Sequence, residues 1–167
     1  NGLPLAIEPV ELTAFLHQLA DEYAPDFERA GMTCRLRMPE GAAKAEADGT
    51  LLARAFGNLL SNAARYGNAG GYVEIALHRE GDEWVAAVTN SGEPIPQQDL
   101  PFIFDRFYRV ERSRSKATGG TGLGLAIVKS IIEAHGGTIA ARSAGVETTF
   151  EVRLPAAANL QQSIRHS

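Results

Sequence analysis

Cysteine, long apolar runs and an excess of positive charge are scarce or missing in this sequence, and each absence excludes a class of protein. Cys34 is the single cysteine, which excludes an internal disulfide framework and indicates a reducing compartment. No apolar run approaches the roughly 20 residues that span a bilayer, so we expect no membrane contact within this chain. The formal net charge is -4, so we predict no nucleic-acid partner.

The composition that remains is that of one globular domain. The chain has 167 residues, of which 44% are hydrophobic and 22% charged, enough apolar side chains for a core. It begins at Asn1 with neither an initiator Met nor a signal peptide, so we expect a fragment of a longer protein. We expect one domain over residues 1–155 and a disordered tail over residues 156–167.

Apolar residues recur at helical spacing in three segments, namely residues 12–31, 48–67 and 123–135. In the second segment, Asp48 is expected to cap the N terminus and Gly67 to end the helix. The apolar stripe expected to face the core comprises Leu52, Phe56, Leu59 and Ala63.

The strand signals are short and occur mostly in neighbouring pairs, with an extended segment first and a hairpin in the middle of the chain. Residues 97–121 are polar, basic and glycine-bearing, and predict a mobile loop for the most part. Strand pairs interspersed with helices favour an α+β two-layer sandwich, with a mixed, mostly antiparallel sheet and about three helices on one face. The expected extended segments are residues 4–12, 33–38, 44–48, 71–80, 83–90, 138–143 and 148–154.

A glycine-rich run, GGTGLGLAIVKSIIEAHGG at residues 119–137, leads directly into a helical pattern. It lacks the Lys-Ser/Thr ending of a Walker loop, and it follows no strand as a dinucleotide-binding loop would. Glycines let backbone amides approach an anion, and the free N–H groups of a helix start favour phosphate. From these residues alone, a phosphate-binding loop and a plain flexible loop are equally supported.

Two asparagines, Asn58 and Asn62, lie four residues apart on the second helix and therefore share one face. Arg65 and Tyr66 follow one turn later. Asparagine is a mediocre helix former, so a pair in register indicates a purpose beyond a solvated polar face. Amide oxygens can ligate Mg²⁺ directly or through its waters beside phosphate groups.

The segment VTNSGEPIP at residues 88–96 places Asn90 at the end of a strand, before a turn at Gly92. A side chain in that position can hydrogen-bond the edge of a base in a cleft. Taken alone, an ordinary Asn-Ser-Gly turn is the better interpretation.

A third polar segment, IFDRFYRVERSRSK, combines the aromatic residues Phe104, Phe107 and Tyr108 with a series of cations. The aromatic residues can anchor one end of a loop whose basic part moves over phosphates. A solvated basic loop, or a patch for an acidic partner, explains the same residues. The cations are Arg106, Arg109, Arg112, Arg114 and Lys116.

Taken together and in this order, the segments resemble the ATP-binding catalytic domain of bacterial sensor histidine kinases. This domain has the Bergerat fold, which gyrase, heat-shock chaperone and mismatch-repair ATPases share. NLLSNAARY resembles the N box of the family, NSGEPI the first glycine box, IFDRFYR the phenylalanine box and GGTGLGLAIVKSIIEAHGGTI the second glycine box. The resemblance covers about residues 8–155.

The resemblance implies ATP and Mg²⁺ as cofactors. Asn58 and Asn62 would hold Mg²⁺ between the phosphates, Arg65 would contact phosphate and Tyr66 would pack against adenine. Asn58 and Arg109 are the implied catalytic residues, because Asn58 stands where the ATPase relatives carry a hydrolytic base and thereby favours transfer over hydrolysis. The other implied nucleotide-binding residues are Asn90, Gly92, Ile95, Phe107, Gly120, Thr121, Gly122, Leu123, Gly124 and Thr148.

Three positions depart from the family pattern. Asn90 stands where the family usually carries an Asp that accepts a hydrogen bond from the adenine amino group. The amide oxygen can still accept, but charge assistance is lost and the added NH₂ needs its own partner, so we predict weaker ATP binding. Pro94 replaces a glycine and should stiffen the pocket edge. Glu147 stands where the family commonly carries a glycine before the threonine, here Thr148.

The acceptor histidine of the family reaction is missing, because none of His17, His78, His135 and His166 has the expected neighbours. All four are interpreted as structural or solvated. In the full-length protein, the resemblance implies transfer of the γ-phosphate to a His on a separate dimerisation domain, then to an Asp of a response regulator. It also implies a homodimer and a cytoplasmic position in a membrane sensor protein.

Two other hypotheses remain at this point. One is a stand-alone kinase of the anti-sigma type, or an ATPase, with the same fold. The other is a non-enzymatic pseudokinase or docking module in which the altered Asn90 pocket binds ATP weakly or not at all.

Overall fold

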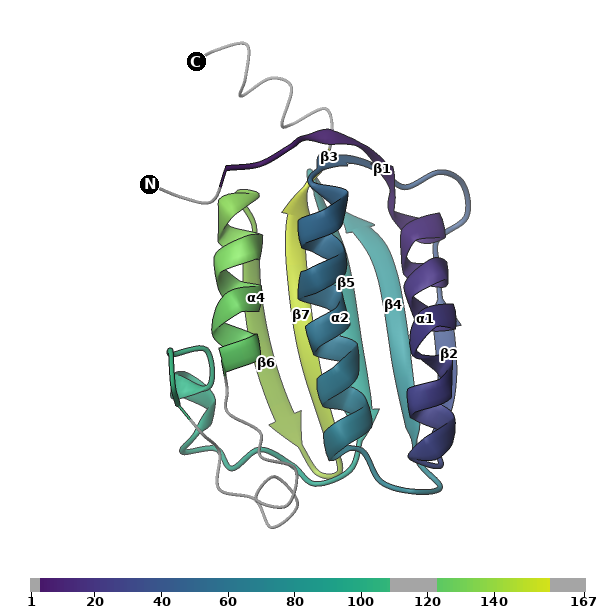
Figure 1. The fold of residues 1–167 in the computed structure, drawn as a ribbon, viewed down its shortest axis with the longest axis vertical. Helices are drawn as coiled ribbons and strands as arrows, with labels where there is room; N and C mark the ends of the chain where they lie inside the picture. The colour runs from purple at the N-terminus through teal and green to yellow at the C-terminus, as the bar shows by residue number, and fades with distance from the viewer. Residues whose placement is uncertain (1–3, 109–122, 157–167) are drawn as a thin grey trace.

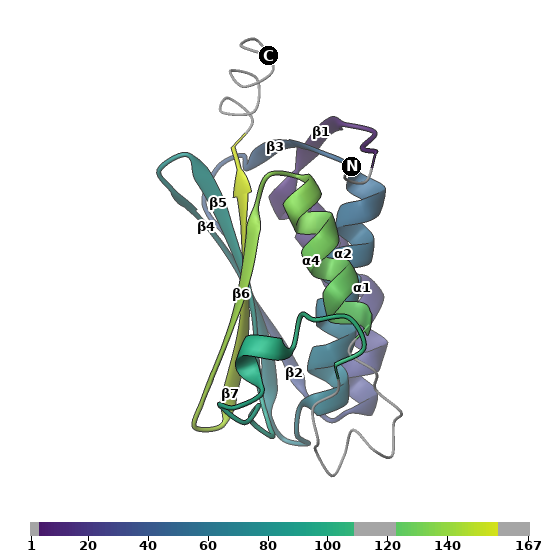
Figure 2. The same ribbon diagram turned by 90° about the vertical axis from the view of Figure 1, so that its left-hand side faces the viewer.

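A computed structural model describes residues 4–108 and 123–156 of the chain. These residues form two layers: a twisted five-stranded sheet, and helices that all cover one of its faces (Figures 1 and 2). This arrangement confirms the predicted two-layer α+β sandwich.

The described elements follow the predicted order along the chain. The helices are α1 (Leu12–Arg29), α2 (Gly49–Tyr66) and α4 (Leu123–Ala134), with a short 3-10 helix η1 (Leu100–Phe102). The strands are β1 (Glu8–Glu11), β2 (Thr33–Arg37), β3 (Lys44–Ala47), β4 (Tyr72–Glu80), β5 (Glu83–Ser91), β6 (Thr138–Ala144) and β7 (Glu147–Pro155).

The main sheet has the strand order β2-β4-β5-β7-β6, so β2 and β6 form its two edges. The β2–β4 pair is parallel and the other pairs are antiparallel, as expected for a mixed, mostly antiparallel sheet. Strands β1 and β3 form a separate antiparallel pair, which crosses one end of the helical layer (Figure 1).

Helix α2 begins and ends where the sequence predicts. The Asp48 side chain accepts a hydrogen bond from the Leu51 N–H at 3.0 Å and so caps the first turn. Gly67 ends the helix, but its φ of -73° is not the left-handed conformation typical of a glycine stop. Space also favours glycine there, because an added Cβ would lie 2.8 Å from the Ala63 carbonyl oxygen and would displace the end of the Met32 side chain.

The core lies between the helices and the inner face of the sheet. The predicted α2 stripe is buried, with Phe56 only 2% exposed and Leu52 fully enclosed. Alternate residues of β4, such as Val73 and Ile75, cover it from the sheet side. None of the described helices is long and apolar enough to cross a bilayer.

The ordered part of the domain reaches at least Ala156, the first residue of the predicted tail. Ala156 is buried, and its N–H donates to the Asp82 carbonyl at 2.8 Å. The rest of the expected tail lies outside the described residues.

Candidate functional site

Helices α2 and α4 lie side by side on the sheet (Figure 1), and the amide side chain of Asn58 joins them. Its Nδ2 donates to the Gly124 carbonyl at 3.3 Å, and a Cβ added to Gly124 would lie 3.7 Å from Cγ of Asn58. The predicted asparagine face of α2 therefore lies against the start of α4. Because Asn58 donates through Nδ2, its Oδ1 remains as a possible metal ligand.

The other polar residues predicted on α2 continue along the same helix. Asn62 lies one turn after Asn58 and is half-buried, whereas Arg65 is exposed in the last turn. Tyr66 is half-buried and ends the helix. The Tyr66 carbonyl lies so close to Gly92 that a Cβ there would approach it to 2.4 Å.

Gly92 joins the end of β5 to the end of α2. Its φ of +144° is a conformation that only glycine adopts without strain. Gly92 also forms an antiparallel β-bridge with Gly67. The Gly92 N–H donates to the Val146 carbonyl at 2.8 Å. Because Val146 lies in the turn between β6 and β7, this bond also ties that turn to the end of β5. Strand β5 extends to Ser91, one residue further than predicted.

Asn90 is buried at the end of β5, on the face of the sheet that the helices cover. Its Nδ2 donates to the Ser91 carbonyl at 3.0 Å, so the partner that the amide NH₂ requires is present in the chain itself. A carbonyl can only accept, so this bond fixes the amide orientation and leaves Oδ1 as an acceptor. Among the described residues, Asn90 Oδ1 is not one of the fully buried side-chain atoms that lack a hydrogen-bond partner.

Thr148 lies directly opposite Asn90 in the β5–β7 register and is buried. Its hydroxyl shares a hydrogen bond of 2.9 Å with the hydroxyl of Ser143 on β6. Ser143 Oγ also accepts from the N–H of Ile95 at 2.9 Å, and Ile95 is itself buried. Asn90, Ile95 and Thr148, predicted separately, thus meet at one end of the sheet.

Ser143 is a residue that the sequence analysis did not single out. It stands at the inward-facing position of β6 opposite Thr148. The alternation of TIAARS marks that face, but the partners of the hydroxyl depend on the register of β6 against β7, which the sequence does not give. Glu147 begins β7 and is exposed, as is Pro94.

The aromatic segment after η1 is anchored by two of the three residues predicted for that role. Phe104 packs edge-on against Phe150 with ring centroids 6.1 Å apart. The Tyr108 hydroxyl donates to Asp99 Oδ1, and this hydrogen bond, more than burial, raises the pKa of Tyr108. The prediction of Phe107 as an anchor was wrong, because its side chain is 72% exposed. Its backbone is left-handed, with a φ of +70°, and the ring points away from the core.

Several predicted residues lie outside the described part of the chain: Arg109, Arg112, Arg114, Lys116, Gly120, Thr121, Gly122 and His166. Leu123 is the first residue of α4. The roles predicted for all of these residues, Leu123 included, remain predictions.

The described residues contain no group of three or more His, Cys, Asp or Glu that could hold a metal ion. His17 and His78 are exposed, as expected for solvated side chains. His135 is buried, and its ring forms two hydrogen bonds to the backbone, as expected for a structural histidine.

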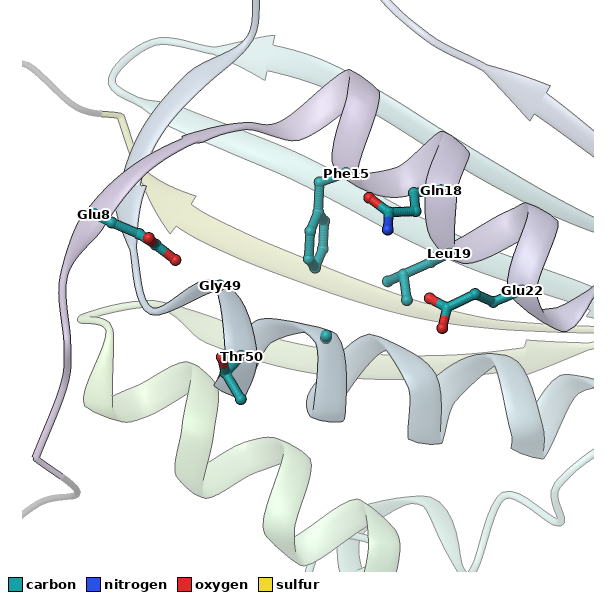
Figure 3. Close-up of a pocket in the computed structure, with 8 residues that line it drawn as sticks. Glu8, Phe15, Gln18, Leu19, Glu22, Gly49 and Thr50 are labelled. Atoms are coloured by element: carbon teal, nitrogen blue, oxygen red, sulfur yellow. The ribbon is translucent and has the colours of Figure 1, made fainter.

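A separate groove of about 370 Å³ runs between α1 and α2 (Figure 3). Phe15 and Leu19 of α1 point into it, and Glu8 lies over the start of α2 at Gly49. None of the predicted site residues lines this groove. The candidate nucleotide site is therefore the opposite flank of α2, between Asn58, Asn90 and the start of α4.

Comparison with known proteins gives a family. A family model described as "Histidine kinase-, DNA gyrase B-, and HSP90-like ATPase" matches residues 47–158. The chain is 40% identical over 151 residues to the sensor protein VanS of Enterococcus faecium, covering 90% of this chain and 39% of VanS. It is 38% identical over 156 residues to the sensor protein CzcS of Cupriavidus metallidurans, covering 92% of this chain and 32% of CzcS.

Solved structures agree with these sequence relatives. The catalytic domain of histidine kinase ThkA superimposes with a TM-score of 0.81 at 25% identity, covering 92% of this chain and 97% of that one. The mycobacterial sensor histidine kinase MprB gives 0.76 at 28% identity, covering 90% and 97%. The chain spans about a third of the length of the curated relatives named here. It belongs to the histidine kinase-, DNA gyrase B- and HSP90-like ATPase family, as the catalytic ATPase domain of the kind found in sensor histidine kinases.

Proposed function

We propose that this domain binds Mg-ATP between α2, the end of β5 and the start of α4, and supplies the γ-phosphate to a histidine on another domain. The observation that carries the proposal is the contact of Asn58 with Gly124, together with Asn90 and Thr148 on adjacent strands at the same end of the sheet. One flank thus offers an amide face and a helix start suited to phosphate, and the other offers an acceptor suited to the adenine amino group.

The donor set fits Mg²⁺. Asn58 uses Nδ2 for Gly124 and keeps an oxygen for a hard cation, and Asn62 lies one turn away on the same helix. Mg²⁺ is commonly held by one or two protein oxygens together with water and substrate phosphates. When bound, Mg²⁺ supplies neutralisation of phosphate charge.

Of the residues on this chain, Asn90 would read the base and Thr148, held by Ser143, would support the edge of the base site. Arg65 is exposed at the end of α2 and free to approach phosphate, and Tyr66 would pack against the base. Arg109 and the glycine box at residues 120–122 complete the proposed phosphate site. Phe107, Ile95 and Gly92 are proposed to border the nucleotide.

The phosphoryl acceptor would be a histidine elsewhere, because the described histidines offer no candidate. His135 is buried with both ring nitrogens occupied, and the flanking residues of His17 and His78 do not match an acceptor site. We therefore propose transfer to the dimerisation domain of the full-length sensor protein and then to a response-regulator Asp. The full-length protein would be a membrane-anchored homodimer with this domain in the cytoplasm.

Isothermal titration of the chain with ATP, with and without Mg²⁺, tests the binding step. We expect one site per chain and weaker binding after removal of Mg²⁺ with EDTA. Adding the dimerisation hairpin of the same protein and labelled ATP should then label a histidine on the hairpin. Absence of ATP binding would overturn the proposal and favour a docking module, whereas ATP hydrolysis without transfer would favour an ATPase.

A further inference from the structure

The ring of His135, immediately after α4, is hydrogen-bonded on both sides in the interior. Nε2 accepts from the backbone N–H of Asp48 at 3.0 Å, and Nδ1 lies 2.8 Å from the Ile131 carbonyl. The ring is 7% exposed and Asp48 is 8% exposed. Because a carbonyl only accepts and an N–H only donates, the two bonds together assign the proton to Nδ1 and the lone pair to Nε2.

Asp48 is the point where three segments meet. Its Oδ1 accepts from Leu51 in the first turn of α2, and its Oδ2 accepts from the N–H of Ala6 at 3.0 Å. Its own N–H is buried and has His135 as its acceptor, and a buried N–H left without an acceptor is costly. The His135 ring therefore ties the C-terminal end of α4 to the N-terminal end of α2.

The opposite end of α4 carries part of the nucleotide site proposed above. There Gly124 contacts Asn58, and residues 120–122 of the glycine box directly precede the helix. The 12 residues of α4 make a helix about 18 Å long. With one end as a pivot, a tilt of only about 3° would move the other end by about 1 Å. Displacements of that size in a binding site can cost orders of magnitude in function.

We propose that His135 is a positioning residue for nucleotide binding. By accepting a hydrogen bond from the Asp48 N–H, it holds α4 in one orientation against α2 and so places Gly124 opposite Asn58. The positioning role rests on the proposed function, because ATP is the ligand proposed there. The hydrogen bond between His135 and Asp48 does not depend on that function.

Another set of contacts at the same end of α4 is independent of the ring. The N–H of Gly137 donates to the Ile132 carbonyl at 3.0 Å and that of Gly136 to Glu133 at 2.9 Å. These backbone bonds close the last turn of α4 before the chain enters β6, and they survive a change of the side chain. Altering the ring should loosen α4 relative to α2 while α4 itself stays folded.

Two amide substitutions separate positioning from mere stability. The amide of glutamine reaches as far as Nε2 of the histidine and can still accept from Asp48, whereas that of asparagine reaches only to Nδ1. We expect H135Q to bind ATP within about twofold of the parent and H135N to bind about tenfold more weakly, at a temperature where circular dichroism shows both fully folded. His17→Asn, on the exposed face of α1, is the matched control and should leave the ATP Kd unchanged.

Nitrogen NMR tests the contact without ATP. We expect the neutral Nδ1–H form of the His135 ring in the parent, and slow hydrogen exchange at the Asp48 amide that H135N abolishes and H135Q keeps. Folded H135N with the parent's ATP affinity, or an Nε2–H ring in the parent, would overturn the proposal. A parent that binds no ATP would overturn both the proposed function and the positioning role, yet the NMR result would still show whether the contact exists.

Discussion

Gly92 shows at the scale of one residue how closely the end of β5 approaches the end of α2. Its backbone has a φ of +144°, and the Tyr66 carbonyl occupies the space a side chain would need. Two separate constraints, conformational and steric, therefore select glycine at this position.

Replacing Gly92 by alanine should destabilise the domain by about 3 kcal/mol or more, because both constraints are violated. The matched control is Gly70→Ala, where φ is +83° but nothing lies within 4 Å of the added Cβ, and about 1 kcal/mol is expected from strain alone. Urea denaturation of the two variants measures the difference. Equal losses would show that the Tyr66 contact can relax.

Asn90 is the residue proposed to read the base, and its amide is oriented by the Ser91 carbonyl. We expect Asn90→Ala to weaken ATP binding about tenfold, because one acceptor for the adenine amino group is lost. Thr89→Val serves as the control. Thr89 lies on the opposite face of β5 from Asn90, and the substitution removes only its hydroxyl contact with Thr149 of β7. Calorimetry that finds the parent affinity in Asn90→Ala would mean that Asn90 does not read the base.

At the scale of the element, the start of α2 depends on one carboxylate. Hydrogen bonds to Asp48, first from the N–H of Ala6 and then from that of Leu51, lower the pKa of its carboxyl below the usual value. A lowered native pKa means that the unfolded chain takes up the proton first as the pH falls. The contribution of Asp48 is thus complete above the ordinary pKa of an aspartate and disappears as the pH drops through the lower native pKa.

Asp48→Asn should therefore reduce the urea midpoint at pH 7, because the single amide oxygen can still cap Leu51 but no second oxygen is left to accept from Ala6. The difference between parent and variant should shrink below about pH 4. Glu40→Gln, at an exposed position between β2 and β3, is a control that should show no such difference. A difference that stays constant down to pH 3 would contradict the assignment.

The elements were predictable from the sequence where the signal is local. Helical periodicity and the Asp48 cap gave α2 its correct limits, and alternation gave the β4–β5 hairpin. The parallel pairing of β2 with β4 and the contact between His135 and Asp48, 87 residues apart, depend on tertiary packing and have no local signature. Asn58 was predictable as a site candidate from its helical spacing to Asn62, and Asn90 and Thr148 only from the family resemblance, whereas Ser143 was missed because its role depends on strand register.

At the scale of the whole molecule, the two layers leave two very different faces on the sheet. The inner face meets the helices, and Phe56 of α2 lies between them, edge-on to Phe15 at 6.1 Å. The outer face carries charged side chains instead, with Arg153 at 2.9 Å from Glu80 and 3.3 Å from both Glu83 and Glu151. The apolar layer boundary, and not this ion-pair network, should hold the fold together, since partly exposed ion pairs contribute little.

Phe56→Ala should accordingly lower the free energy of unfolding by about 3–5 kcal/mol, because it leaves a cavity between the layers. Arg153→Ala should change it little, and 1 M NaCl should reduce even that difference by screening the three carboxylates. Urea denaturation of both variants at low and high salt makes the comparison. A large, salt-sensitive loss of unfolding free energy in Arg153→Ala would mean that the ion pairs on the outer face of the sheet help to hold the fold together. A loss confined to Phe56→Ala would assign that role to the core between the layers.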